Sequence, residues 1–261
     1  MEYNYRYGKR ITEQIKGGKL IHEELEEEAN VPIILQPKSY ADAIYKKLYE
    51  SCVALDSLKK KGRTREVSLY GRMSNYRLVG KVDELRLRDG MTVIREDKTR
   101  ANAKIPSESQ MTTHKIQVLM YRMLLGDITA GRYTSEAFKK VFGTSTLRMT
   151  EEFRRQLNAL GIEAALQSVD SVADRYFGSM TDLRVSDTLE LRYIDQFTGN
   201  EIKLYTFQYS NDEAQQVVQY ALKYWDGGRE SMPVPEQERW KCNYCVFFGK
   251  ECKVWWPQKV L

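Results

Sequence analysis

The feature that most constrains the fold is a tight strand–turn–strand pattern at residues 76–97. The runs YRLVGKVDELRLR and MTVIRED alternate between apolar and polar residues on either side of Asp89-Gly90. An Asp-Gly pair between two alternating runs is the strongest short signal for a β-hairpin. The run REVSLYG, at residues 65–71, predicts a third strand just upstream. A three-stranded antiparallel meander is therefore expected near the middle of the chain.

Helical patterns surround this meander. One helix is expected to start after Gly17-Gly18, and a second covers residues 39–61 and ends at Gly62. Pro106 and the capping pattern Ser107-x-x-Gln110 open a long third helix. Residues 134–178 are mostly helical, TLELRYI and EIKLYTFQ form two more strands, and a last helix runs from Ser210 to about Trp225. This order predicts one mixed α/β domain over residues 1–261, with a central mixed sheet flanked by helices.

Composition limits the class of protein. The chain has 261 residues, 30% of them charged, and a formal net charge of +5, which permits a nucleic-acid partner without requiring one. No apolar run approaches the roughly 20 residues that span a bilayer, and the polar N-terminus shows no signal peptide. We therefore expect an intracellular monomer without a membrane partner. Four cysteines in such a chain favour metal or core roles over disulfides.

Two carboxylates at the end of the hairpin are candidates for a cation site. Asp83 and Glu96 are equidistant from the Asp89-Gly90 turn, so they should face each other at about 5 Å across the ladder. Carboxylates this close repel unless a cation lies between them, and Mg²⁺ or Mn²⁺ suits oxygen ligands. Lys98 projects from the same side as Glu96, whereas Asp97 points to the other side. The alternative is a surface ladder of solvated charges.

Two further elements place polar groups near this pair. His22, one of only two histidines, follows Gly18 by four residues on the first helix. Gln117 and Tyr121 share one face of the long helix after the hairpin. On residue type alone, His22 could equally be a packed or solvated histidine, and Gln117 and Tyr121 ordinary boundary and core residues.

The tail at residues 240–255 is rich in cysteine. Cys242 and Cys245 form a C-x-x-C pair, and Cys252 follows. This spacing indicates metal ligation, and zinc is the default metal from spacing alone. The remaining cysteine, Cys52, falls on the apolar side of its helix and is expected in the core.

Taken together, these motifs resemble the exonuclease V family of RecB-like PD-(D/E)XK nucleases. The resemblance rests on GKVDELRLRDGMTVIREDKTRANAKIPSESQMTTHKIQVLMYR, on the Gly18–His22 motif and on the tail RWKCNYCVFFGKECKVW. It implies a PD-(D/E)XK (RecB-like) nuclease core with a cysteine-rich C-terminal metal-binding tail. It also implies a role for each candidate residue: His22, Asp83 and Glu96 bind Mg²⁺ or Mn²⁺, Lys98 positions and polarises the attacking water, and Gln117 and Tyr121 support the site.

The resemblance also implies a 4Fe-4S cluster held by Cys242, Cys245, Cys252 and a fourth cysteine far upstream. The chain departs from the family pattern in two places. Val82 stands where the motif has proline, and Met1 stands where the first cluster cysteine would fall. A truncated chain, a misassigned start or an incomplete cluster would each explain Met1. Cys52 is the only spare cysteine for the fourth position.

The function that this resemblance implies is metal-dependent exonucleolytic hydrolysis of single-stranded DNA, in DNA repair and genome maintenance. In a eukaryote the expected compartment is the nucleus or the mitochondrion, and otherwise the cytoplasm. Three alternatives remain open at this point: a CRISPR-adaptation or replication-type iron–sulfur nuclease of the same branch, a non-catalytic nucleic-acid-binding module, and a zinc-stabilised structural protein. Digestion polarity, product length and preference for DNA over RNA do not follow from the residues.

Overall fold

The computed structural model describes residues 13–29, 33–102, 104–250 and 252. These residues form two compact units, Glu13–Gln215 and the described part of the chain from Gln216 onward. The first unit contains the whole sheet described below. The single domain expected over residues 1–261 stays a prediction, and the expectation about Met1 lies outside the described residues.

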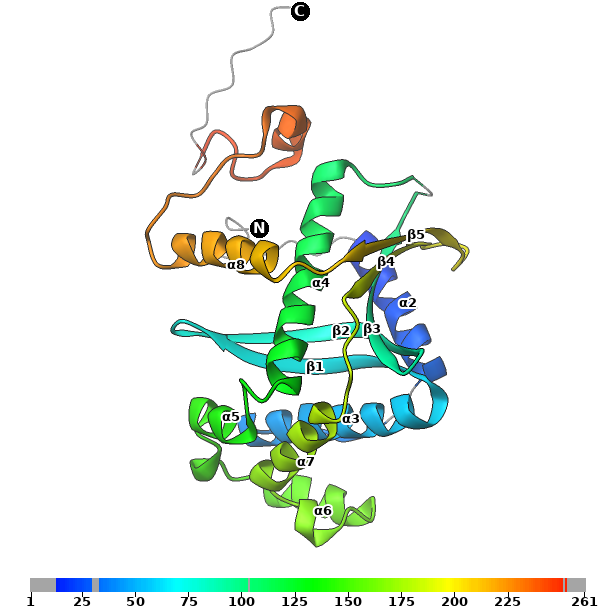
Figure 1. Ribbon diagram of the computed structural model, residues 1–261, viewed down its shortest axis with the longest axis vertical. Coiled ribbons are helices and arrows are strands. Elements are labelled where there is room, and N and C mark those ends of the chain that lie inside the picture. The colour runs from blue at the N-terminus through cyan, green and yellow to red at the C-terminus, as the bar shows by residue number, and fades with distance from the viewer. Residues whose placement is uncertain (1–12, 30–32, 103, 251, 253–261) are drawn as a thin grey trace, which may run out of the picture. The chain divides into compact units, whose positions relative to one another are not determined.

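A five-stranded mixed sheet forms the centre of the first unit (Figure 1). The strands lie in the order of the sequence, and only β3 and β4 pair in parallel. This confirms the predicted mixed sheet and all five predicted strands. The strands are β1 (Arg63–Met73), β2 (Tyr76–Arg88), β3 (Met91–Arg100), β4 (Thr188–Asp195) and β5 (Glu201–Gln208).

The hairpin between β2 and β3 has the register that the sequence predicts. Its pairs run from Arg88↔Met91 to Glu84↔Arg95. Both turn residues have positive φ, 50° at Asp89 and 72° at Gly90. Two left-handed residues in a two-residue loop suit the twist of the flanking strands, which is why an Asp-Gly pair determines this register.

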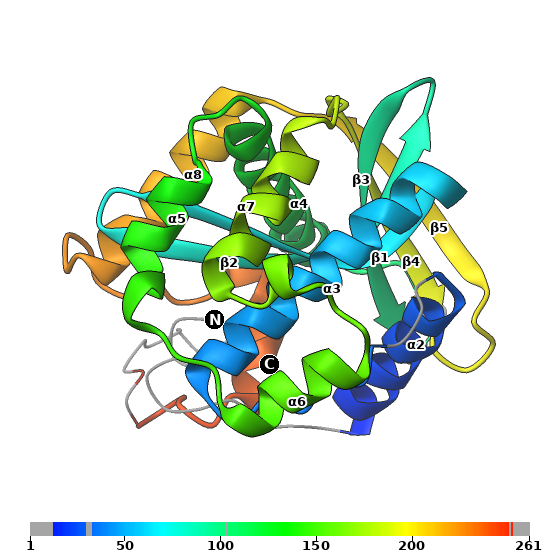
Figure 2. The same ribbon diagram turned by 90° about the horizontal axis from the view of Figure 1, so that it is seen from below.

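Helices pack on the sheet and enclose the core. The predicted helix at residues 39–61 is confirmed as α3 (Tyr40–Lys61), with a capping box at Ser39 and left-handed Gly62 at its end. α3 contacts β1 and α7 (Val169–Thr181), and the two helices lie side by side (Figures 1 and 2). The predicted long helix is α4 (Glu108–Thr129), which crosses four strands, β1 to β4. α5 (Ser135–Phe142) and α6 (Glu151–Ala159) precede α7.

The first described helix corrects one expectation. α2 spans Glu13–Ala29, so it begins before Gly17-Gly18 instead of after them. Close packing explains the glycine at position 18, because a Cβ there would lie 2.6 Å from Oγ1 of Thr99 on β3. The glycines therefore allow the helix to approach the sheet and do not mark its start.

The second unit carries the cysteine-rich tail. The predicted last helix is confirmed as α8 (Asn211–Trp225), which starts in the first unit and ends in the second. η3 (Glu236–Tyr244) follows it. Among the described residues, no helix combines the length and apolar character that crossing a membrane requires.

Candidate active site

The two predicted carboxylates lie where the sheet splays apart. β2 pairs with β3 only as far as Glu84↔Arg95, and from Arg95 onward β3 pairs in parallel with β4. Asp83 and Glu96 occupy the next position of the hairpin register, just beyond its last pair. There the Asp83 carboxylate accepts a hydrogen bond from the backbone N–H of Asp97, at 2.8 Å. A side chain thus takes the place of a ladder hydrogen bond and ties the two strands together at the fork.

Both carboxylates are buried and electrostatically unfavourable as anions. Asp83 is 9% and Glu96 1% exposed. Burial, and next the charge of Asp83, raises the pKa of Glu96 to about 8. Burial also raises the pKa of Asp83. Oε2 of Glu96 is buried and has no hydrogen-bond partner in the described part of the chain. A buried carboxylate oxygen without a partner, beside a second carboxylate, is suited to bind a cation.

Lys98, Gln117 and Tyr121 form a hydrogen-bonded chain that starts at Glu96. Nζ of Lys98 lies 2.6 Å from Oε1 of Glu96 and 2.9 Å from Oε1 of Gln117. Nε2 of Gln117 in turn donates to the Tyr121 hydroxyl at 2.8 Å. Glycine at position 80 leaves room for this arrangement, because a Cβ there would lie 2.6 Å from the Tyr121 ring. The structure therefore brings these four predicted site residues together.

His22, which α2 supplies, lies near the Asp83 carboxylate. Its Nδ1 is 3.8 Å from a carboxylate oxygen of Asp83 and 3.8 Å from one of Glu66. The nearby Glu66 carboxylate raises the pKa of the His22 imidazole, against the opposing effect of burial. The second histidine, His114, instead contacts the hydroxyl of Tyr193 at 2.9 Å. The close approach of Gly18 to β3, one helical turn earlier, positions His22 over the carboxylates.

Glu66 is the site residue that sequence reasoning missed. One oxygen or nitrogen atom from each of His22, Glu66 and Asp83 lies within 4.8 Å of the others. Glu66 occupies the position opposite Asp83 in the β1–β2 register and has a φ of 59°, uncommon for a residue other than glycine. The signal was available: Glu66 and Asp83 are equidistant from the Ser74-Asn75 turn, as Asp83 and Glu96 are from Asp89-Gly90.

The remaining charges at this end of the sheet form a separate ion-pair network. Asp97 points away from the site, as expected, and accepts hydrogen bonds from Arg65 at 2.7 Å and from Arg192 at 2.8 and 2.7 Å. Glu84 also pairs with Arg65, at 3.0 Å. Burial acts against ionisation of Asp97, yet the hydrogen bonds from Arg192 and the charge of Arg65 lower its pKa. The charge-rich stretch at residues 95–98 therefore divides between two sets of partners.

The cysteines also separate into two environments. All four are free. Cys52 is 1% exposed in the core, and burial raises the pKa of its thiol to about 12. In the tail, the N–H of Cys245 donates to the carbonyl of Cys242 at 3.1 Å, and the N–H of Cys252 to the carbonyl of Phe247 at 2.9 Å. These turns give the tail a local structure, whereas the buried thiol of Cys52 is a poor candidate for the fourth ligand.

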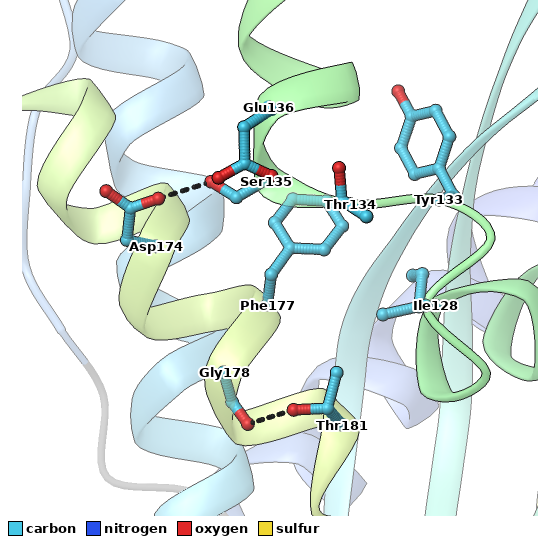
Figure 3. Close-up of a pocket in the computed structure, with 10 residues that line it drawn as sticks. Ile128, Tyr133, Thr134, Ser135, Glu136, Asp174, Phe177, Gly178 and Thr181 are labelled. Carbon is cyan, nitrogen blue, oxygen red and sulfur yellow. Dashed lines mark hydrogen bonds between the residues drawn. The ribbon is translucent and has the colours of Figure 1, made fainter.

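A pocket of about 260 Å³ lies apart from this site, between the end of α4, α5 and α7 (Figure 3). Figure 3 shows Asp174 accepting a hydrogen bond from Ser135, at 2.6 Å, beside Phe177. Lys139 also pairs with Asp174, at 2.6 Å. None of the predicted site residues lines this pocket, and the Asp174 carboxylate already has partners.

Most of the chain can be aligned with known proteins. Exonuclease V of Danio rerio is 26% identical over 247 residues, which are 90% of this chain and 60% of that protein. The chain therefore spans 60% of the length of this curated relative. A solved structure, "Crystal structure of SSO0001", aligns with 88% of this chain and 93% of its own chain, at 16% sequence identity. The TM-score of this alignment is 0.37.

The family assignment rests on a sequence profile. The profile described as "Exonuclease V - a 5' deoxyribonuclease" matches residues 2–93, 88–184 and 162–256. These three matches overlap and together extend over nearly the whole sequence. The protein therefore belongs to the exonuclease V family.

Proposed function

We propose that this protein is a metal-dependent nuclease of the PD-(D/E)XK type that hydrolyses phosphodiester bonds in DNA. The observation that carries the proposal is the group formed by Asp83, Glu96 and Lys98. Two buried carboxylates lie where β2 and β3 cease to pair, and the ammonium group of Lys98 lies 2.6 Å from the Glu96 carboxylate. Membership of a family described as a deoxyribonuclease supports the same activity.

The donor set suits a divalent cation. Asp83 and Glu96 offer carboxylate oxygens, one of them buried without a partner among the described residues, and His22 offers a ring nitrogen nearby. Oxygen-rich sites of this kind favour Mg²⁺ or Mn²⁺. When bound, such an ion supplies Lewis acidity toward a phosphate and lowers the pKa of water.

The other residues act by position and charge. Lys98 orients the attacking water and places positive charge where the transition state accumulates negative charge. Gln117 holds the Lys98 ammonium at 2.9 Å, and Tyr121 holds Gln117 at 2.8 Å, so the lysine keeps one orientation. Positioning of this kind lowers the entropic cost of reaching the transition state.

We further propose that the substrate is single-stranded DNA attacked from a free end, in the repair or maintenance of the genome. The family description supports DNA and the 5′ end. Tyr121 on α4 belongs to the hydrogen-bonded chain of the site, and Arg100 follows Lys98 by two residues on β3. An aromatic ring and a cation suit the binding of an unpaired strand. Monomeric state and an intracellular compartment, nuclear, mitochondrial or cytoplasmic, belong to the same proposal.

The test compares linear and circular forms of one single-stranded DNA sequence, with Mg²⁺ and with EDTA. Linear DNA should be degraded only with Mg²⁺, while the circle and a blunt duplex should remain intact. A 5′ label should appear in short products at the earliest times. Equal cleavage of the circular and the linear DNA would indicate an endonuclease. Activity confined to duplex DNA or RNA would refute the proposed substrate. Full activity in EDTA would refute metal dependence.

We also propose that Cys242, Cys245 and Cys252 ligate one metal centre, a 4Fe-4S cluster. The C-x-x-C spacing and the local turns of the tail support ligation. Such a cluster takes four protein ligands, and the described residues offer three in the tail, since Cys52 is buried in the core. The tail alone therefore fits the cluster incompletely, and zinc is the alternative that metal analysis distinguishes.

A further inference from the structure

We propose that Glu66 is an additional ligand of the divalent cation, and that the ammonium group of Lys81 occupies its carboxylate until the cation binds. The inference rests on the proposed metal-dependent activity and adds to it a residue and a counter-ion. It concerns the three acidic residues Glu66, Asp83 and Glu96, which lie on three neighbouring strands next to the register pairs Arg65↔Glu84 and Glu84↔Arg95.

Glu66 lies close to two other residues that can ligate a metal ion. Oε1 of Glu66 and Oδ1 of Asp83 both lie 3.8 Å from Nδ1 of His22. The three residues present their ligand atoms within 4.8 Å of one another. Two carboxylates and an imidazole at this spacing are a ligand set for a divalent ion, and modest side-chain adjustment would bring all three into coordination.

A second, independent observation also points to a cation. Glu96 is 1% exposed, and its Oε2 has no hydrogen-bond partner in the part of the chain that the structure describes. This orphan oxygen belongs to the carboxylate that faces Asp83 from the other neighbouring strand. A buried, unpartnered carboxylate oxygen is costly unless a positive charge compensates it.

The ammonium group of Lys81 already forms an ion pair with Glu66. Its Nζ lies 2.6 Å from Oε2 of Glu66, and the lysine side chain is 53% exposed while that of Glu66 is 13% exposed. Lys81 precedes Asp83 by two residues on β2, as Lys98 follows Glu96 by two residues on β3. Lys98, however, is fixed by two acceptors, whereas the exposed Lys81 can swing into solvent when a metal ion takes its place.

The competition predicts opposite effects for two substitutions. Glu66→Gln removes a ligand charge and should weaken Mn²⁺ binding by about 10-fold or more, as loss of a ligand-shell partner does elsewhere. Lys81→Ala removes the competing ammonium and should tighten Mn²⁺ binding by about two- to five-fold, the equivalent of a partly exposed ion pair. Glu152→Gln is a matched control, because Glu152 on α6 pairs with Lys38 at 2.6 Å and lies outside the ligand group.

The experiment is a calorimetric titration of EDTA-treated, dialysed full-length protein with Mn²⁺, with the electron paramagnetic resonance signal of free Mn²⁺ as a second readout. Circular dichroism checks that each variant is folded. Unchanged affinity in Glu66→Gln, or unchanged or weaker affinity in Lys81→Ala, would overturn the inference. The proposed function fails separately, if the unmodified protein binds no divalent cation or if Asp83→Asn binds it equally well.

Discussion

At the scale of single residues, the fold buries Asp83 and Glu96 although burial disfavours the charged form of a carboxylate. Both are buried, and among the described residues Lys98, a backbone N–H and the nearby His22 offset their charges. A bound cation would relieve this cost, so catalysis and stability should respond to the same residues.

The first residue-scale prediction concerns catalysis. Asp83→Ala and Lys98→Ala should each abolish Mg²⁺-dependent DNA cleavage while the fold survives. Loss of Lys98 should cost on the order of 3–4 kcal/mol of transition-state stabilisation, or roughly 10²- to 10³-fold in rate. Single-turnover cleavage of a labelled strand measures the effect, with Lys60→Ala on the exposed end of α3 as control. Cleavage at the unmodified rate by either variant would contradict the nuclease assignment.

The second residue-scale prediction concerns pH. The pKa of Glu96 is raised from its ordinary value of 4.5 to about 8, and that of Asp83 is raised as well. In EDTA, the free energy of unfolding should therefore fall as pH rises from about 4.5 to about 8, by at most about 1.4 kcal/mol per pH unit for one group.

Urea denaturation at a series of pH values measures this dependence. Glu96→Gln should flatten the curve and raise stability at pH 8, and Mg²⁺ should restore stability to the unmodified protein there. A stability that rises across this window relative to Glu96→Gln would contradict the assigned pKa direction.

At the scale of elements, two close approaches place helices against the sheet. Gly18 lets α2 approach β3, which places His22 over the carboxylates, and Gly80 leaves space for Tyr121 from α4. These glycines act through the absence of a side chain, because their φ values are not positive. The position of α2 should therefore be sensitive to a single methyl group.

The element-scale prediction uses this sensitivity. Gly18→Ala should lower the free energy of unfolding by about 1–3 kcal/mol through overpacking against Thr99, although alanine is the better helix former. Thr99→Ala in the same chain should recover part of the loss. Gly178→Ala in α7 is the matched control, since a Cβ there meets nothing within 4 Å. Thermal melts measure all four proteins, and equal melting temperatures for Gly18→Ala and the unmodified chain would exclude the packing role.

At the scale of the whole molecule, the tail and the sheet-containing unit carry different chemistry. The tail cysteines are exposed or half-buried thiols on short turns, while the carboxylate site lies within Glu13–Gln215. Metal in the tail should therefore depend on the cysteines and be independent of the carboxylates.

The molecule-scale prediction is made for anaerobically purified protein. It should be brown, and Cys242→Ser, Cys245→Ser and Cys252→Ser should each remove the colour, whereas Cys52→Ser and Asp83→Ala should keep it. Iron and zinc analysis alongside visible absorption measures the outcome. One zinc per chain with no iron would show that the cluster does not occur in this protein.

Local signals in the sequence determined much of this structure. The Asp89-Gly90 turn fixes the β2–β3 register, because two left-handed residues favour one loop geometry. Ser39 and Ser107 begin the α3 and α4 helices, because their side chains accept hydrogen bonds from free backbone N–H groups. That register places Asp83 and Glu96 just beyond its last pair, with Lys98 two residues further along β3.

Only the tertiary structure decided the rest. The parallel pairing of β3 with β4 joins segments about ninety residues apart, and no local pattern specifies it. From Arg95 onward, β3 pairs with β4 in place of β2, and the carboxylates lie at this change of partner. Gly17-Gly18 suggest a helix start in the sequence, because the side chains that they approach, Gln196 and Thr99, are distant along the chain. The Ser74-Asn75 turn places Glu66 level with Asp83, but His22 and Lys81 come from other elements and reach the Glu66 carboxylate only once the sheet has formed.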